Sequence, residues 1–145
     1  MLPVRIRRLH PSVPLPDYQT PGAAGFDLAA SADVEIPAGN IALVPTGLVI
    51  EVPPGHFLGI FARSSTPLKR GLIVANGVGV IDQDYCGPAD EVRIQVLNFT
   101  QGAVHVRKGD RIAQGLFIPV ARAEWRETEA DLRDGSRGGF GATGR

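Results

Sequence analysis

Short stretches in which residue type changes with a period of two, separated by turn-forming residues, are the feature that most constrains the fold of this chain. The period covers residues 48–52, 57–61, 92–96, 104–106 and 116–120. Turn-forming residues lie between these stretches, as at Pro53-Pro54-Gly55, Gly102 and Lys108-Gly109-Asp110. A period of two indicates β-strands, and many short strands joined by turns are typical of a β-sandwich, jelly roll or barrel. We therefore predict an all-β fold.

A single short helix is expected in residues 63–71. There Ser65 or Thr66 can cap the helix, Pro67 suits its first turn, and Gly71 suits the position after its last residue. More helix than this is not expected, because 18 glycines and 12 prolines in 145 residues are too many for a helical protein. A chain of this length fits one domain with a hydrophobic core.

The carboxyl-terminal part of the chain differs in composition from the rest. Residues from about 127 onward are charged and then rich in glycine, ending in the stretch Asp134–Arg145. Glycine-rich sequence of this kind cannot support packed structure alone. We therefore predict a β-rich core at residues 1–126 and a flexible arm at residues 127–145.

The charge balance and the single cysteine exclude several classes of protein. Lys and Arg total 15, and so do Asp and Glu, so nucleic acid and anionic membranes are not expected as partners. No apolar run approaches the roughly 18 residues of a membrane span, and the amino terminus lacks a signal-peptide pattern. Cys86 has no second cysteine for an internal disulfide. We expect a cytoplasmic protein.

The segment Asn76–Gly87 is the strongest candidate for a binding site. Its three glycines make a poor strand and a good tight hairpin, whose backbone can approach a ligand closely. The edge of a base could pair with groups of this hairpin, namely the Asn76 amide and the backbone of Gly77 and Val80. Asp82 is then available to hold and activate water, with Tyr85 as a flat wall. The alternative is that Asp82 forms the turn and Tyr85 is a core aromatic.

Three further segments of the core carry polar residues that could bind an anion or support its binding. Arg63, Ser64 and Ser65 combine a forked guanidinium with two hydroxyls before the expected helix. Gln114 could donate a hydrogen bond to a phosphate. The segment Gly22–Ala30 packs small residues around Asp27. The alternative for residues 63–65 is an ordinary helix cap, and the alternative for the segment around Gln114 is a solvated hairpin with a salt bridge. The alternative for Gly22–Ala30 is a turn in which Asp27 caps backbone amides.

The glycine-rich arm could act as a lid. Phe140 would stack on a planar ring, while Arg137 and nearby backbone amides, including that of Gly141, would reach phosphates. The alternative is a disordered tail, although Phe and Arg are unusual in a purely flexible linker.

Taken in their order along the chain, the five segments resemble the five motifs of the trimeric deoxyuridine triphosphate nucleotidohydrolases, the dUTPases, over roughly residues 20–144. The resemblance implies a jelly-roll-like protomer and a homotrimer with three active sites at subunit contacts. It implies that the arm of one subunit closes over a site formed by others. The reaction would be hydrolysis of dUTP to dUMP and pyrophosphate, which keeps uracil out of DNA and supplies dUMP for thymidylate synthesis.

The resemblance also implies a role for each candidate residue. Asp82 would activate water for attack on the α-phosphorus, and Asn76 with the hairpin backbone would pair with uracil. Tyr85 would exclude a 2′-hydroxyl. The triphosphate would be held by Mg²⁺ and by Arg63, Ser65, Gln114 and Arg137. Mg²⁺ would be carried mainly by the phosphates themselves, with Asp27 as a possible outer-shell contact.

Two departures from the family pattern stand out. The arm arginine usually lies five residues before the phenylalanine, whereas here Arg137 lies three before Phe140 and Arg133 lies seven before it. Arg137 is our candidate. The family also has Tyr-Arg-Gly-Glu where this chain has the longer segment Tyr85–Glu91. We expect this change to affect a subunit contact more than the chemistry.

Two other functions remain open at this stage. One is a dCTP deaminase or a bifunctional deaminase and dUTPase of the same fold, although the sequence around Asp82 and Tyr85 favours hydrolysis. The other is a non-catalytic nucleotide-binding trimer.

Overall fold

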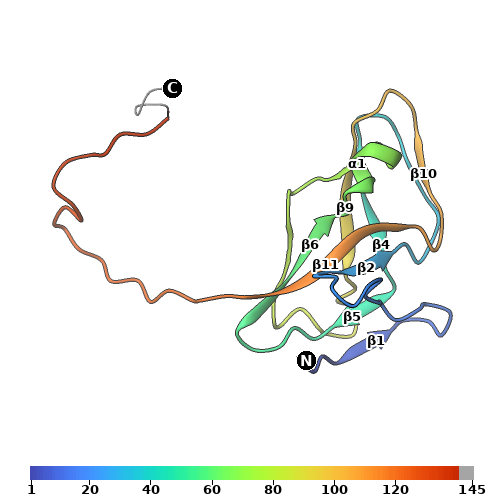
Figure 1. The fold of residues 1–145 in the computed structure, drawn as a ribbon, viewed down its shortest axis with the longest axis horizontal. Coiled ribbons are helices and arrows are strands. Elements are labelled where there is room, and N and C mark those ends of the chain that lie inside the picture. Colours follow the sequence, from blue (N-terminus) through green and yellow to red (C-terminus); the bar gives the residue numbers. More distant parts are fainter. Residues whose placement is uncertain (141–145) are drawn as a thin grey trace.

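The computed structural model of the protein describes residues 1–140, which form a β-rich core and an extended carboxyl-terminal segment (Figure 1). The strands of the amino-terminal half are β1 (Ile6–Arg8), β2 (Phe26–Ala29), β3 (Val34–Ile36), β4 (Ile41–Pro45), β5 (Leu48–Ile50) and β6 (His56–Ala62). After the helix α1 (Ser65–Arg70) come β7 (Leu72–Val74), β8 (Gly79–Ile81), β9 (Arg93–Asn98), β10 (Val104–Val106) and β11 (Arg111–Pro119). The prediction of an all-β fold with one short helix is confirmed.

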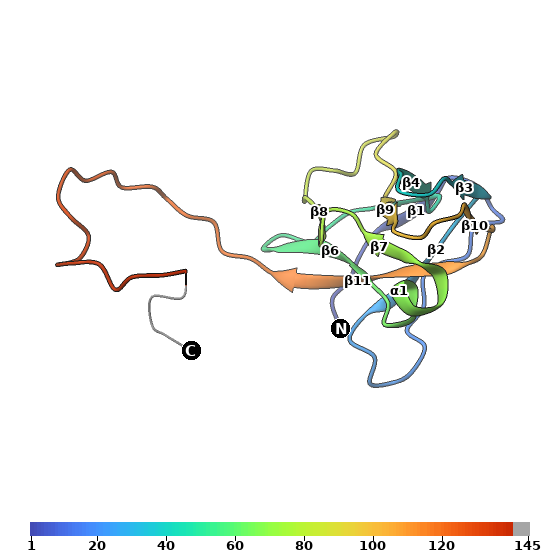
Figure 2. The ribbon, with the colours of Figure 1, turned by 90° about the horizontal axis from the view of Figure 1, so that it is seen from above.

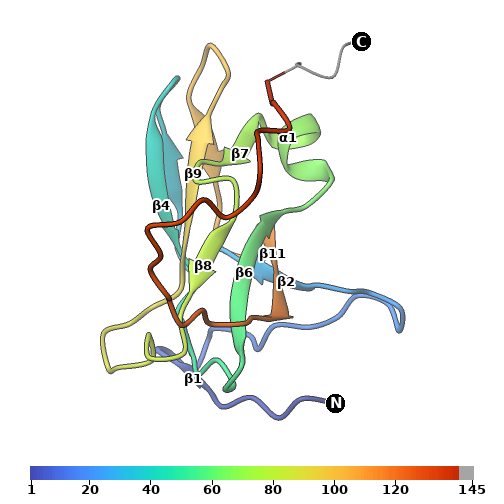
Figure 3. The ribbon, with the colours of Figure 1, turned by 90° about the vertical axis from the view of Figure 1, so that its left-hand side faces the viewer.

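Two larger sheets enclose the core, as Figure 3 shows. One has the strand order β2-β11-β6-β8, and the other has the order β4-β9-β7; all of their pairs are antiparallel. Two short pairs, β1 with β5 and β3 with β10, close the ends of this jelly-roll-like arrangement. Both larger sheets contribute to one hydrophobic cluster, which includes Leu58, Ile60, Val44, Ile94 and Val96.

The period of two in the sequence corresponds to burial in some strands and not in others. In β9, Ile94, Val96 and Asn98 are buried while Arg93 is exposed, as the alternation predicts. All three residues of β5 are buried, so the period of two does not correspond to burial in this strand, which pairs with β1. Each fully buried Ile or Leu stabilises the fold by roughly 1.5–3 kcal/mol.

The helix begins one residue earlier than the capping prediction placed it. Ser64 is the N-cap and makes no side-chain capping hydrogen bond, so the prediction of Ser65 or Thr66 as the cap is wrong. The Thr66 hydroxyl is buried instead and donates to the Ile112 carbonyl at 2.8 Å, which ties the helix to β11. Gly71 ends the helix with φ of 64°, as predicted. A Cβ at Gly71 would lie 2.1 Å from Thr100 Cγ2, so a larger residue would not fit.

The segment Asn76–Gly87 is not the single tight hairpin that its glycines suggested. Gly79–Ile81 form β8, which pairs with residues 58–60 of β6. Gly79 favours this strand because a Cβ there would lie 3.0 Å from the Ile60 Cβ, so the glycine permits a close approach of two backbones. A turn precedes the strand, where Gly77 has φ of 73°, and another turn follows it.

The carboxyl-terminal segment leaves the core at the end of β11 and extends away from it, as Figures 1 and 2 show. All residues from Pro119 to Phe140 are exposed. The predicted boundary after residue 126 lies inside this exposed stretch. Within the described residues, no helix is long and apolar enough to cross a membrane.

An ion pair connects the last turn of α1 to the turn before β11. Arg70 Nη1 lies 2.8 Å from Asp110 Oδ2, and the same oxygen accepts a hydrogen bond from the Arg107 amide at 2.9 Å. Arg70 and this amide hold the pKa of Asp110 below its ordinary value. The salt bridge considered for the turn at residues 108–110 therefore forms with the helix.

Replacing Asp110 by Asn should lower the free energy of unfolding by about 0.5–1 kcal/mol near neutral pH, where the carboxylate is ionised. Because the folded-state pKa lies below 3.8, the ion pair stabilises the fold above that pH and its contribution is lost as pH falls through the folded-state pKa. Urea unfolding at pH values from about 7 to about 3 should therefore show a difference in the free energy of unfolding between the unaltered protein and Asp110→Asn, and this gap should close on acidification. An Asp134→Asn control, in the exposed segment, should show no gap. A gap that persists in acid would mean that packing, not charge, is responsible.

Candidate active site

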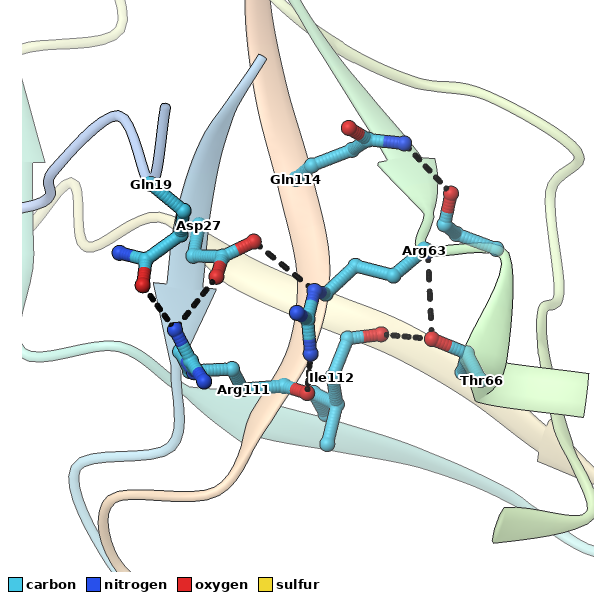
Figure 4. Close-up of polar contacts among 8 residues, drawn as sticks. Gln19, Asp27, Arg63, Thr66, Arg111, Ile112 and Gln114 are labelled. Carbon is cyan, nitrogen blue, oxygen red and sulfur yellow. Dashed lines mark hydrogen bonds and ion pairs between the residues drawn. The ribbon is translucent and has the colours of Figure 1, made fainter. Parts of the chain in front are cut away.

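A nearly buried carboxylate lies between two arginines where β2, β6 and β11 meet α1 (Figure 4). Asp27 Oδ1 is 2.8 Å from Arg63 Nε, and Asp27 Oδ2 is 3.1 Å from Arg111 Nη1. The Asp27 side chain is only 11% exposed. Its Oδ2 is buried and, within the described part of the chain, accepts no hydrogen bond of good geometry, so the contact with Arg111 is an ion pair only.

An irregularity in β11 brings the polar residues of this cluster to one face of the sheet. Gln114 pairs with Asp27 and Ala113 with Leu28, but Arg111 pairs with Ala29, so Ile112 is an extra residue. Without this bulge Arg111 and Gln114 would point to opposite faces, because side chains alternate along a strand. The bulge also turns the Ile112 carbonyl toward the Thr66 hydroxyl, which is the bond that holds α1 to β11.

The predicted residues Arg63 and Gln114 lie beside each other in this cluster. Gln114 Nε2 donates to the Ala62 carbonyl at 3.0 Å, and Arg63 follows Ala62 directly. Arg63 Nη1 donates to the Arg111 carbonyl at 3.0 Å. Arg63 thus uses two of its five donor N–H groups on the protein, and the others can still meet a ligand. Ser64 and Ser65 start the helix next to it, Ser64 exposed and Ser65 half-buried.

Two residues of the cluster, Arg111 and Gln19, were not predicted as site residues. Arg111 pairs with Asp27, and its guanidinium also donates to the Gln19 side-chain oxygen, so it connects the loop before β2 to β11. A chain that alternates regularly would have placed Arg111 on the opposite face from Gln114. The bulge that brings them together has no signal in the period of the sequence, so the sequence did not indicate Arg111 as a site residue.

The second group of predicted residues lies along β8 and the turns beside it. Asn76 and Gly77 precede the strand, Val80 is 58% exposed on it, and Asp82 follows it, exposed. Asp82 and Val80 line a cavity of about 700 Å³ together with His56 and Arg122.

Tyr85 is 39% exposed and donates its hydroxyl proton to the Glu91 carbonyl at 3.1 Å. The alternative that Tyr85 is a core aromatic is therefore wrong. Its ring stands on the surface next to the turn that carries Asp82, whose carbonyl accepts a hydrogen bond from the Tyr85 amide at 3.3 Å.

Within one chain the two groups lie at opposite ends of β6. Ile81 pairs with Leu58, so Asp82 lies beside Phe57. Arg63 is six residues further along, or roughly 20 Å at about 3.3 Å per residue. Asp27 and Arg111 line a different cavity, of about 550 Å³.

The arm residues form a third region. Arg133, Arg137 and Phe140 are fully exposed in the extended carboxyl-terminal segment. Gly141, the remaining candidate, lies outside the described residues. A single chain thus places the predicted residues in three separate regions.

The residues present suit Mg²⁺ only in an outer-shell role. No group of three or more His, Cys, Asp or Glu side chains in residues 1–140 is arranged to hold a metal ion directly. Mg²⁺ typically keeps several waters and binds through one or two carboxylates and substrate phosphates. The buried Asp27 Oδ2, which lacks a hydrogen bond among the described residues, is an acceptor of the kind that a metal-bound water needs.

Comparison with known proteins identifies the family of this chain. The sequence profile of the dUTPase family matches residues 12–144. The deoxyuridine 5'-triphosphate nucleotidohydrolase of Anaeromyxobacter sp. (strain Fw109-5) is 44% identical over 98% of this chain and 97% of its own length. The crystal structure of a dUTPase from Streptococcus mutans is 37% identical, covers 84% of this chain and 98% of its own, and has a TM-score of 0.76.

A more distant structure matches the fold over almost the whole chain. The dUTPase of Staphylococcus bacteriophage 80alpha, solved with dUPNHPP, has a TM-score of 0.86 and covers 99% of both chains at 21% identity. With a family profile spanning residues 12–144 and relatives above 40% identity over nearly the full length, this chain belongs to the dUTPase family.

Proposed function

We propose that this protein hydrolyses dUTP to dUMP and pyrophosphate. The single observation that carries the proposal is the family match over residues 12–144, which contains all five candidate segments. No feature of the described residues favours the deaminase or the non-catalytic alternative.

The triphosphate is proposed to bind at the cluster around Asp27. Arg63 is held by Asp27 and by the Arg111 carbonyl, so its remaining donors are oriented before substrate arrives. The Ser64 and Ser65 hydroxyls and the second N–H of the Gln114 amide lie beside it and can donate to phosphate oxygens. A Cβ at Gly25 would lie 2.8 Å from Gln114 Oε1, so this glycine leaves space for the amide.

The outer edge of β8 is proposed to bind uracil. This strand is the last in its sheet, so its outward N–H and C=O groups are not used by β6. They can pair with the edge of the base near Gly77 and Val80, with the Asn76 amide beside them. A base with a different donor pattern would leave buried polar groups unpaired, which is the strongest source of selectivity in such a site. Tyr85 is proposed to lie against the sugar and exclude a 2′-hydroxyl.

Asp82 is proposed as the general base. It is exposed at the end of β8, beside the strand that would hold the base, and it can take a proton from a water that attacks the α-phosphorus. Negative charge then moves toward the leaving pyrophosphate, where Arg63 and Arg137 would neutralise it. Mg²⁺, when bound to the phosphates, supplies further charge neutralisation. Asp27 would accept a hydrogen bond from its water shell.

We further propose that three subunits share each site. The separation of roughly 20 Å between Asp82 and Arg63, from about 3.3 Å per residue of β6, is too long for one dUTP to touch both within a chain. A homotrimer in which neighbouring copies present their β8 edge and their Asp27 cluster to each other brings both groups to one substrate. The exposed arm of a further copy would close over the substrate with Phe140 and Arg137. Arg137 is preferred to Arg133 as the arm arginine because it lies nearer to Phe140 in the sequence.

Replacing Asp82 by Asn should reduce kcat by about 10²–10⁴-fold, because the amide cannot accept the proton from water, while dUTP binding persists. Asp84→Asn is the matched control, since it removes an equal charge two residues away. Pyrophosphate release measures turnover, and calorimetry with a non-hydrolysable dUTP analogue measures binding. Unchanged kcat in Asp82→Asn would rule out its role as base. Ammonia release from dCTP by the unaltered protein would favour the deaminase instead.

Removing residues 130–145 should abolish most activity without lowering the thermal midpoint of unfolding, because residues 119–140 are exposed and outside the core. Mixed trimers sharpen this test. Neither the truncated protein nor Asp82→Asn should be active alone, but trimers assembled from both should regain activity, since one chain supplies the arm and another supplies Asp82. No recovery in mixed trimers would contradict the shared site, and full activity of the truncated protein would contradict the lid.

A further inference from the structure

The loop from Tyr85 to Glu91 is held by hydrogen bonds at both ends and in the middle. At one end Tyr85 donates to the Glu91 carbonyl at 3.1 Å. In the middle the Gly87 amide donates to Asp90 Oδ2 at 2.7 Å, and Arg7 Nη2 donates to the Pro88 carbonyl at 2.6 Å. The loop is therefore held by specific bonds, although much of it is exposed.

The Glu91 end of the loop is held to the core by several hydrogen bonds. The Glu91 side chain is only 12% exposed and accepts hydrogen bonds from the Gly47 amide at 2.7 Å and from Arg93 Nε at 3.2 Å. The next amide, of Val92, donates to the Leu48 carbonyl at 2.8 Å. Because the Glu91 side chain and the following residue are both fixed to the core, the Glu91 carbonyl is a fixed acceptor for the Tyr85 hydroxyl.

The turn in the middle of the loop sets the distance between its two ends. Asp90 bonds to Gly87 through its side chain, and its own amide donates back to the Gly87 carbonyl at 3.2 Å. A Cβ at Gly87 would lie 2.8 Å from Asp90 Oδ2, so the turn closes tightly only because residue 87 is glycine. This turn brings Tyr85 and Glu91 close enough to bond.

We propose that Asp90 and Glu91 are positioning residues that hold the Tyr85 ring against the sugar and thereby set the preference for deoxyribose over ribose. This inference rests on the proposed function. Tyr85 is 39% exposed, so packing alone does not fix its ring, and the bond to Glu91 limits its rotation. The loop would thus act on specificity, and the effect on a subunit contact that the sequence suggested stays a prediction.

The first test removes only the hydrogen bond between the Tyr85 hydroxyl and the Glu91 carbonyl. Tyr85→Phe keeps the aromatic ring and loses the hydroxyl that bonds to Glu91. The ratio of kcat/KM for dUTP to that for UTP should fall about three- to tenfold, the range expected for one hydrogen bond. The ratio of the Kd for UMP to the Kd for dUMP, measured by calorimetry, which needs no turnover, should fall by the same factor.

The second test acts on the loop without touching the ring. Asp90→Ala removes the bond to Gly87 and should lower the same two ratios, whereas Asp90→Asn keeps an acceptor oxygen and should restore them. Glu51→Gln, a change of an exposed carboxylate outside the loop, is the control and should leave both ratios unchanged.

The outcomes separate a positioning role from a structural one. Lower selectivity in Tyr85→Phe and Asp90→Ala, at an unchanged thermal midpoint, supports the proposal. A lower thermal midpoint with unchanged selectivity overturns it, as does an unaltered protein that binds dUMP and UMP equally. A protein that binds dUMP more tightly than UMP but does not hydrolyse dUTP would refute the proposed function. The Kd values of the variants would then still test the role of the loop.

Discussion

The carboxylate of Asp27 is the interaction on which the candidate phosphate site depends. It joins Arg63, at the end of β6, to Arg111, on β11, although the three residues are far apart in the sequence. Removing one partner of a buried ion pair typically costs about 3–5 kcal/mol, because the other charge stays in a low-dielectric environment. The cost here should be smaller, since Arg63 is 27% exposed and Arg111 is 46% exposed. The exposed parts of both guanidinium groups are also the parts that an incoming anion can reach.

Local features of the sequence predicted the fold class well and individual elements less well. The period of two led to the all-β fold because alternate residues of strands such as β9 face one core. The glycine content of residues 76–87 led to a wrong expectation at β8, where Gly79 was interpreted as a turn residue, although the close approach of Ile60 makes glycine suitable for a strand there. Thr66 was expected to cap the helix, but its hydroxyl bonds to the Ile112 carbonyl, a partner 46 residues away. Contacts of this length carry no local signal.

The same limit applies to the candidate site. The motifs identified Asp27, Arg63, Asp82 and Gln114 as polar residues in unusual surroundings, and the structure places three of these four side chains in one cluster. Arg111 lies in that cluster only because of the bulge at Ile112, which has no signal in the period of the sequence. The position of Tyr85 depends on Glu91, so the ring and its acceptor had to be seen together.

Register also supports the proposal that a complete site requires more than one chain. In an antiparallel pair, the residue that follows β8 must lie beside the start of β6, and the residue that follows β6 must lie at the other end. Asp82 and Arg63 each follow their strand, so no rotation of side chains can bring them together within a chain. In the proposed trimer, a second copy would bring its own β8 edge near the first copy's Arg63. The arm, which extends away from its own core (Figure 2), would then serve a site that this core does not complete.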